Sequence, residues 1–135
     1  MTTLQLGETI MNFAYWMVLV AAFLPGLTMG TAKAAAGRKY DNAAPRAWAE
    51  KLSGWQRRAG WAQNNHFEAF PGFAAGVIIA ELCHVPQPRI DLLAGIFIAA
   101  RLVYTGVYLA GYASLRTLVW LVGAAAVVML FVSGI

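Results

Sequence analysis

The chain has 135 residues, of which 60% are hydrophobic and only 12% are charged. A soluble domain usually carries about 25% charged residues, so this composition excludes a soluble globular fold and predicts a protein dissolved in lipid. The net charge of +4 comes mostly from one loop, where membrane orientation and lipid headgroups account for it. It therefore gives no indication of nucleic-acid binding.

Four apolar stretches follow one another, each near the roughly 20 residues that a bilayer crossing needs. We place these spans at about residues 10–33, 55–83, 89–111 and 115–134. They leave little sequence for anything else, so we expect a single domain over residues 1–135. The predicted fold class is an all-α membrane protein, a bundle of four transmembrane helices.

The first span resembles a signal peptide in its position and apolarity. Its start lacks a basic region, and Pro25-Gly26 is not a small-x-small cleavage site, so we interpret it as a retained helix. Gly26 and Gly30, like Gly72 and Gly76 in the second span, have the four-residue spacing that is typical of closely packed membrane helices.

The basic residues predict the orientation. The first loop is far more basic than the other polar ends, which by the positive-inside rule places it in the cytoplasm and both termini on the opposite side. Arg116 in the third loop agrees with this orientation, whereas Arg89 in the second loop is an exception. The first-loop basic residues are Lys33, Arg38, Lys39, Arg46, Lys51, Arg57 and Arg58, against Asp41 and Glu50.

Polar residues recur at helical spacing inside the second and third spans. Ser53 is a candidate N-cap, and the helix that follows is long enough for its polar first half to extend beyond the bilayer core. Its polar face comprises Arg57, Trp61, Asn64 and Glu68, with Arg58 and Asn65 alongside. In the third span one face carries Arg101, Tyr104, Tyr108 and Gly111.

Glu68 and Arg101 lie well inside their spans, where an unpaired charge costs roughly 2.5 to 3.5 kcal/mol on insertion scales. Counted from Cys83 and Arg89, which bracket the intervening turn, their depths differ by only about 5 Å at 1.5 Å per residue. We therefore expect a Glu68–Arg101 ion pair inside the bundle.

Simpler structural roles exist for each of these residues. A single buried ion pair locks helix register, two tyrosines fit an interfacial aromatic belt, and Arg116 fits a topology anchor. Taken together, however, the residues indicate a cationic, hydrogen-bonding pocket near the cytoplasmic end. Such a pocket suits an anionic, water-soluble ligand that meets a lipophilic one from the membrane. Its members are Arg57, Asn64, Asn65, Tyr104, Tyr108 and Arg116.

Other site chemistries find little support. His66 and His84 are isolated, without cysteine or carboxylate partners at ligand spacing, so we predict no metal site. Cys83 is the single cysteine, which excludes an intrachain disulfide. We interpret it as a small buried hydrophobe rather than a catalytic thiol.

At these residues the sequence resembles the MAPEG family, the membrane-associated eicosanoid and glutathione metabolism proteins, over about residues 10–130. The stretch from Arg58 to Pro71, Arg-Ala-Gly-Trp-Ala-Gln-Asn-Asn-His-Phe-Glu-Ala-Phe-Pro, is similar to the family's second-helix signature. Residues 100–108 and 115–116 are similar to its third- and fourth-helix motif. The segment from Tyr40 to Arg46 is closer to bacterial members, which implies a bacterial inner membrane.

The resemblance implies a homotrimer that binds glutathione between adjacent protomers, as co-substrate of a transferase or peroxidase. Asn65 and Glu68 match positions that hold glutathione or support the ion pair, and Arg101 matches the arginine paired with that glutamate. Tyr104 and Tyr108 match tyrosines that line the site. Arg116 matches, with a one-residue gap, the arginine credited with stabilising the glutathione thiolate. The expected site thus has Arg116 and Tyr108 as catalytic residues and, as glutathione-binding residues, Arg57, Arg58, Asn64, Asn65, Glu68, Arg101 and Tyr104.

One position departs from the family pattern. Several mammalian members have an arginine seven residues before the glutamate, where this chain has Trp61; Arg57 or Arg58, about one turn earlier, is the candidate substitute. Lys33 is the candidate for the basic residue expected near the end of the first helix.

Two other functions compete with a glutathione-dependent enzyme acting on lipophilic electrophiles or lipid hydroperoxides. The first is a non-enzymatic protein of the same fold that binds lipid or another anion. The second is a small drug/proton exporter, which requires an ionisable carboxylate in the first span; here Glu8 precedes that span, so we rank the exporter low.

Overall fold

A computed structural model describes residues 11–135; Glu8, which precedes the first predicted span, and Ile10, where that span starts, lie outside the described residues. Helices account for most of the described chain, and no strand occurs in it, in agreement with the all-α prediction. In chain order the elements are α1 (Phe13–Ala36), the 3-10 helix η1 (Gly37–Lys39), α2 (Pro45–Glu50), α3 (Gly54–Leu82), α4 (Gln87–Ala110) and α5 (Ala113–Val132).

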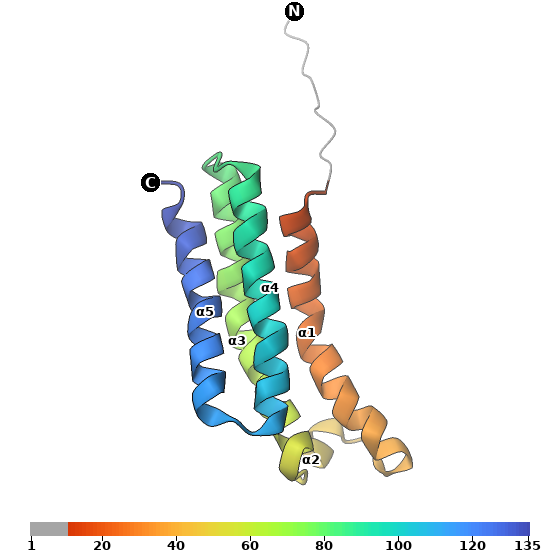
Figure 1. The fold of residues 1–135 in the computed structure, drawn as a ribbon. Helices are drawn as coiled ribbons and strands as arrows, with labels where there is room; N and C mark the ends of the chain where they lie inside the picture. The colour runs from red at the N-terminus through yellow and green to blue at the C-terminus, as the bar shows by residue number, and fades with distance from the viewer. Residues whose placement is uncertain (1–10) are drawn as a thin grey trace, which may run out of the picture.

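The four long helices lie side by side, and the short α2 closes one end of the bundle (Figure 1). α3 and α4 occupy the centre, since each contacts the other and both flanking helices, whereas α1 and α5 lie on opposite sides. The start of α1 and the C-terminus are at the same end, opposite α2. This arrangement places the basic first loop and the α4–α5 turn together at the α2 end.

Three helices are long and apolar enough to cross a membrane in the part of the chain that is described: α1 continued to Lys39, α4 and α5. α3 is the longest helix at 29 residues, but it carries Arg57, Arg58, Glu68 and Glu81 and is not apolar enough to count with them. The prediction of an integral membrane protein is therefore supported by three helices, and the crossing by α3 stays a prediction.

Helix boundaries follow local signals in the sequence. Ser53 is the N-cap residue of α3, as predicted, although its side chain makes no capping hydrogen bond. Gly111 ends α4 with a φ of 89°, in the left-handed region that glycine adopts at little cost. Cys83 follows the end of α3 and is exposed in the turn to α4, so its predicted burial is wrong.

Polar contacts attach the start of α1 to the α3–α4 turn. The side chain of Asn12 caps α1 by accepting from the Tyr15 N–H, and its amide donates to Glu81 Oε1 at 2.7 Å. The carboxylate of Asp91 accepts from the Ala14 N–H at 3.0 Å and from Gln87 at 2.8 Å. These bonds satisfy N–H groups that a helix start otherwise leaves without partners.

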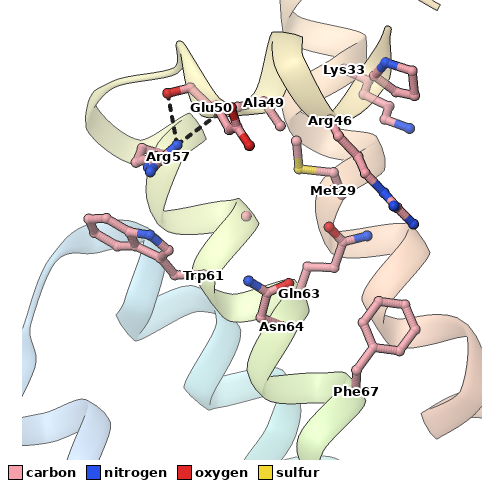
Figure 2. Close-up of a pocket in the computed structure, with 12 residues that line it drawn as sticks. Met29, Lys33, Arg46, Ala49, Glu50, Arg57, Trp61, Gln63, Asn64 and Phe67 are labelled. Atoms are coloured by element: carbon pink, nitrogen blue, oxygen red, sulfur yellow. Dashed lines mark hydrogen bonds between the residues drawn. The ribbon is translucent and has the colours of Figure 1, made fainter.

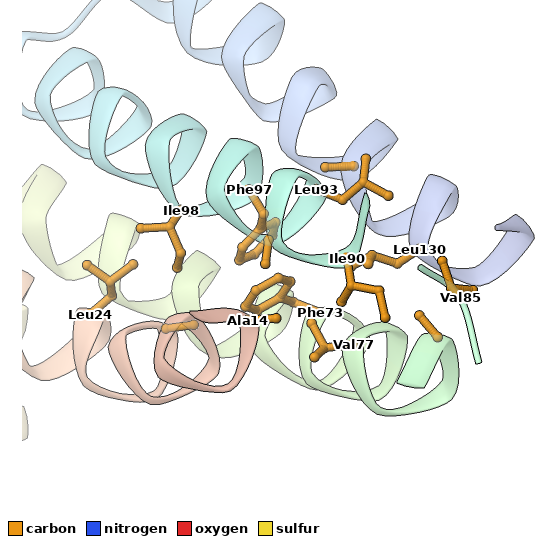
Figure 3. Close-up of a cluster of buried hydrophobic side chains, with 14 residues drawn as sticks. Ala14, Leu24, Phe73, Val77, Val85, Ile90, Leu93, Phe97, Ile98 and Leu130 are labelled. Carbon is orange, nitrogen blue, oxygen red and sulfur yellow. The ribbon is translucent and has the colours of Figure 1, made fainter. Parts of the chain in front are cut away.

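The hydrophobic core is an aromatic pair surrounded by aliphatic side chains (Figure 3). Phe73 of α3 and Phe97 of α4 stack with ring centroids 3.9 Å apart, and Phe73 is fully buried. The core brings all four long helices together, and its buried members are Ala14, Ala21, Leu24, Phe73, Val77, Ala80, Val85, Ile90, Leu93, Ala94, Phe97, Ile98, Ala126 and Leu130.

Gly76 allows α3 and α5 to approach closely, which leads to a stability prediction. A Cβ at this position would lie 3.2 Å from the Phe131 ring and 3.3 Å from Leu130 Cβ, so we expect Gly76→Ala to destabilise the protein by about 1–3 kcal/mol through overpacking. At Gly72, one turn earlier, the nearest atom is Val127 Cγ1 at an ordinary 3.8 Å. Thermal unfolding in detergent should therefore separate Gly76→Ala from Gly72→Ala, which has room for the methyl group and gains up to about 1 kcal/mol of helix propensity; equal losses would contradict the packing argument.

Candidate functional site

The polar residues of α3 divide between two faces of the helix, although the sequence analysis placed them on one. Asn64 lines a cavity with Arg57 and Trp61, whereas Asn65 lines two others, one of them with Glu68. Successive residues of an α-helix are about 100° apart, and this rotation directs Asn64 toward α1 and α2 and Asn65 toward α4 and α5.

Two adjoining spaces lie between α3, α4 and α5. The first, of about 270 Å³, we call the tyrosine cavity; its lining residues are Asn65, Tyr104, Tyr108, Arg116, Thr117 and Trp120. The second, of about 350 Å³, we call the apolar groove; it is lined by Asn65, Glu68, Ala69, Gly72, Phe97, Arg101, Trp120, Gly123, Ala124, Val127 and Val128. Asn65 and Trp120 line both, so a polar space continues directly into an apolar one.

Two tyrosines of the tyrosine cavity lie between two arginines. The guanidinium of Arg101 lies 4.3 Å from the Tyr104 ring centroid, and that of Arg116 lies 4.5 Å from the Tyr108 ring centroid. The two tyrosine rings meet edge to face, with centroids 5.4 Å apart. Each arginine is thus held over an aromatic face, a favourable cation–π arrangement, and the four side chains form a continuous row.

This row follows from local sequence. Residues 101, 104 and 108 are spaced by three and four, so they share one face of α4, as predicted. Gly111 then turns the chain, and Arg116 comes from the first turn of α5. The short turn is what brings a residue of the fifth helix back over a tyrosine of the fourth.

Arg101 is buried, with only 3% of its surface exposed, and its contacts correct a prediction. Its guanidinium donates to Asn65 Oδ1 at 2.9 Å and, through Nε, to His66 Nδ1 at 3.1 Å. Asn65 in turn donates to Glu68 Oε2 at 3.4 Å. The direct Glu68–Arg101 ion pair is wrong for the described chain, because Asn65 stands between the two charges and Glu68 is exposed.

His66 completes this network and was missed by the sequence analysis. It is 3% exposed, and its Nε2 lies 2.9 Å from the Thr105 hydroxyl, which donates to the Arg101 carbonyl oxygen at 2.8 Å. Because Nδ1 accepts from Arg101, the network assigns the ring proton to Nε2, which then donates to Thr105. With a neutral imidazole, the hydrogen bonds among Arg101, His66 and Thr105 each have one donor and one acceptor. The sequence analysis considered His66 only as a metal ligand and set it aside because it has no partners at ligand spacing. Its position next to Asn65 was the feature that could have indicated a role in this network.

Arg58 lines neither the tyrosine cavity nor the apolar groove, and it holds the end of α4. Its Nε and Nη2 donate to the Leu109 carbonyl oxygen at 2.9 and 2.7 Å. Gly111 lies against this guanidinium, since a Cβ there would be 3.6 Å from Arg58 Cζ. Arg58 thus satisfies a carbonyl that a helix end leaves without a partner, and the structure separates it from the residues with which it was predicted to bind a ligand.

A third cavity, of about 570 Å³, lies between α1, α2 and α3, and we call it the α1–α3 cavity (Figure 2). Arg57 is fixed there, because its Nη1 donates to the carbonyl oxygens of Ala49 and Glu50 at 3.2 and 2.9 Å. The lining residues are Met29, Lys33, Pro45, Arg46, Ala49, Glu50, Arg57, Gly60, Trp61, Gln63, Asn64 and Phe67.

The described chain is a helical membrane protein with a buried guanidinium network and a polar cavity that opens into an apolar groove. The family model of the MAPEG family matches residues 13–135, nearly the whole chain, and the protein belongs to that family. It is therefore a membrane protein of the glutathione and eicosanoid metabolism family. Searches of curated proteins and of solved structures found no match.

Proposed function

We propose that the protein is a glutathione-dependent membrane transferase or peroxidase that acts on lipophilic electrophiles or lipid hydroperoxides. The observation that carries this proposal is the row of Arg101, Tyr104, Tyr108 and Arg116, which ends beside the apolar groove. An anionic peptide-like co-substrate fits the row, and an apolar one fits the groove. Both reactants then meet near Asn65 and Trp120, which line both spaces.

Arg116 and Tyr108 are the residues we propose for catalysis. A free thiol with a pKa of about 8.5 is only about 3% ionised at pH 7, and a guanidinium beside the sulfur favours the thiolate. Arg116 remains charged in a partly dry site, and its position over Tyr108 fixes its orientation. The Tyr108 hydroxyl is a suitable donor to the sulfur. Asn65, Tyr104 and Arg101 offer donors for the polar groups of glutathione.

The proposed reactions use glutathione as the nucleophile. In conjugation the thiolate attacks an electrophilic carbon, a C–S bond forms, and the leaving group departs with the electron pair of the bond that breaks. In peroxide reduction the thiolate attacks the distal oxygen, the O–O bond breaks, and the alkoxide takes a proton to become an alcohol. A second glutathione then displaces water from the sulfenic acid and gives glutathione disulfide. Neither sequence requires a cysteine of the protein.

We further propose that all four long helices cross the membrane and that the chain assembles as a homotrimer. Asn64, Glu68 and Trp61 are exposed on α3 in the isolated chain, and an exposed carboxylate at membrane depth is costly. Burial of the Glu68 carboxylate against a second copy removes that cost. The basic α2 end then faces the cytoplasm of a bacterial inner membrane, with both termini on the other side.

The non-enzymatic alternative rests on Trp61, which stands where an arginine is expected. Trp61 lines the α1–α3 cavity and leaves the tyrosine cavity of its own chain intact, and this placement favours the enzyme.

The test is glutathione binding and turnover by the purified protein. Calorimetry with millimolar glutathione, together with conjugation of 1-chloro-2,4-dinitrobenzene and reduction of cumene hydroperoxide, should give saturable binding and a rate that saturates with glutathione. S-methylglutathione, which lacks a free thiol, should bind without supporting turnover. Binding without turnover would support the non-enzymatic alternative, and the absence of both would contradict the proposal.

A further inference from the structure

Near its start, α3 is attached to the end of α4 by a guanidinium and by an apolar contact. Arg58 donates from Nε and from Nη2 to the Leu109 carbonyl oxygen, at 2.9 and 2.7 Å. The Leu109 side chain packs against a buried cluster of Met29, Ala32 and Ala59, of which Ala59 is the next residue along α3. A polar and an apolar contact therefore hold the end of α4 in place, at the α2 end of the bundle (Figure 1).

The carbonyl that Arg58 holds belongs to the turn that places Arg116. Leu109 directly follows Tyr108, and the Arg116 guanidinium lies 4.5 Å from the centroid of the Tyr108 ring. After Leu109 the chain turns at once: the Gly111 N–H donates to the Tyr108 carbonyl oxygen at 3.1 Å, and the Arg116 N–H donates to the Tyr112 carbonyl oxygen at 3.0 Å. Because this connection is short and hydrogen-bonded, the direction of the α4 end sets the position of the arginine over the tyrosine.

Arg58 satisfies a carbonyl for which the turn supplies no backbone donor among its first residues. In a continuous helix the Leu109 carbonyl oxygen accepts from the N–H four residues later, but Gly111 ends α4 with a φ of 89° and α5 begins at Ala113. The N–H groups of Gly111 and Tyr112 donate to carbonyls that precede Leu109. A cation at the C-terminus of a helix also interacts favourably with the helix dipole. Loss of the guanidinium therefore weakens the end of α4 at the point where the turn starts.

We propose that Arg58 is a positioning residue that, by holding the end of α4, keeps the Arg116 guanidinium over Tyr108, where it acts on the sulfur. This inference rests on the proposed function, because it concerns the same reaction. Arg58 lines neither the tyrosine cavity nor the apolar groove, so its effect passes through the α4–α5 turn. A displacement of about 1 Å caused by a change far from the chemistry can lower a rate about 100-fold. A loosened turn therefore lowers the rate through Arg116.

Amide hydrogen exchange tests this role without any turnover. In Arg58→Ala the amides of residues 111–116 should exchange about 10-fold faster, because a hydrogen bond to a charged group is lost and the turn opens locally. Amides near Ala14, at the other end of the bundle, should exchange as in the wild type. Mass spectrometry of peptides from the full-length protein in detergent measures both regions. The matched control, Arg38→Ala, removes an exposed arginine of η1 and should leave the turn protected.

The kinetic test is a double-variant cycle with Arg116. Arg58→Ala should lower kcat/KM for the conjugation of 1-chloro-2,4-dinitrobenzene about 10-fold at pH 7 and, like Arg116→Ala, lose less at high pH. In the Arg116→Ala background the same substitution should lower kcat/KM less than about 2-fold, because the group that it positions is already absent. Arg58→Lys keeps a donor but loses the planar fork, and it should recover part of the rate.

Other outcomes would overturn this role of Arg58. Unchanged exchange of residues 111–116 in Arg58→Ala would show that it does not hold the turn. Losses that multiply in the double variant would show that Arg58 acts independently of Arg116, and a higher KM for glutathione at every pH with an unchanged kcat would make it a ligand contact. An inactive wild type sinks the proposed function and this role with it, whereas an active wild type with multiplying losses sinks the positioning role alone. If Arg58→Ala does not fold, Arg58→Lys carries both measurements with smaller expected effects.

Discussion

Arg116→Ala is expected to lower kcat/KM for glutathione conjugation about 30-fold at pH 7 and to lose little activity above pH 9.5. The reason is ionisation: without the guanidinium, a thiol with a pKa of about 8.5 is only about 3% thiolate at pH 7 but largely ionised at pH 9.5. The rise of activity with pH should therefore shift upward in the variant, to a midpoint near 8.5. A pH series of initial rates with 1-chloro-2,4-dinitrobenzene measures this directly.

Two further variants separate the thiolate effect from a loss of structure. Arg116→Lys keeps the charge but loses the planar guanidinium over Tyr108, and it should fall between the wild type and Arg116→Ala. Arg89→Ala removes an exposed arginine at the other end of the bundle and should leave the profile unchanged. A uniform loss at every pH in Arg116→Ala would assign Arg116 to binding or folding and contradict its role at the sulfur.

Local signals in the sequence were sufficient to predict where the long helices begin and end. The apolar stretches predicted at residues 55–83, 89–111 and 115–134 begin and end within about two residues of α3, α4 and α5, and Ser53 is the N-cap residue of α3 as predicted. The spacing of Arg101, Tyr104 and Tyr108 also predicted their common face, because a single helix fixes it. These inferences succeeded because each depends only on neighbouring residues.

The sequence did not predict those contacts of the site that depend on the rotation of each helix about its own axis. Depth along the membrane correctly placed Glu68 near Arg101, but depth carries no information on rotation, and Asn65 occupies the intervening direction. The same rotation separates Asn64 from Asn65. Arg58 was predicted as a ligand residue because it lies about one turn before Trp61, where the resemblance implies an arginine, yet its contact is a carbonyl of another helix. Such contacts exist only once the helices are packed.

The buried network of Arg101, His66 and Asn65 leads to a prediction in which a second substitution repairs the first. His66→Leu removes the Nδ1 acceptor of a guanidinium that is 3% exposed. A buried donor left without an acceptor costs about 1–3 kcal/mol, and more when it is charged, so we expect a loss of about 3 kcal/mol. Arg101→Leu removes the charge itself and leaves neutral acceptors without donors, which costs about 1–3 kcal/mol.

The double variant His66→Leu/Arg101→Leu should therefore be more stable than His66→Leu alone, because it no longer buries a charged guanidinium that lacks one of its acceptors. The measurement is the free energy of unfolding in mixed micelles at constant protein concentration, which keeps any contribution from oligomerisation equal. His66→Gln, which retains an acceptor, should lose less than His66→Leu. If the two single losses add in the double variant, then His66 and Arg101 act independently, and the neutral histidine does not serve as the partner of the buried arginine.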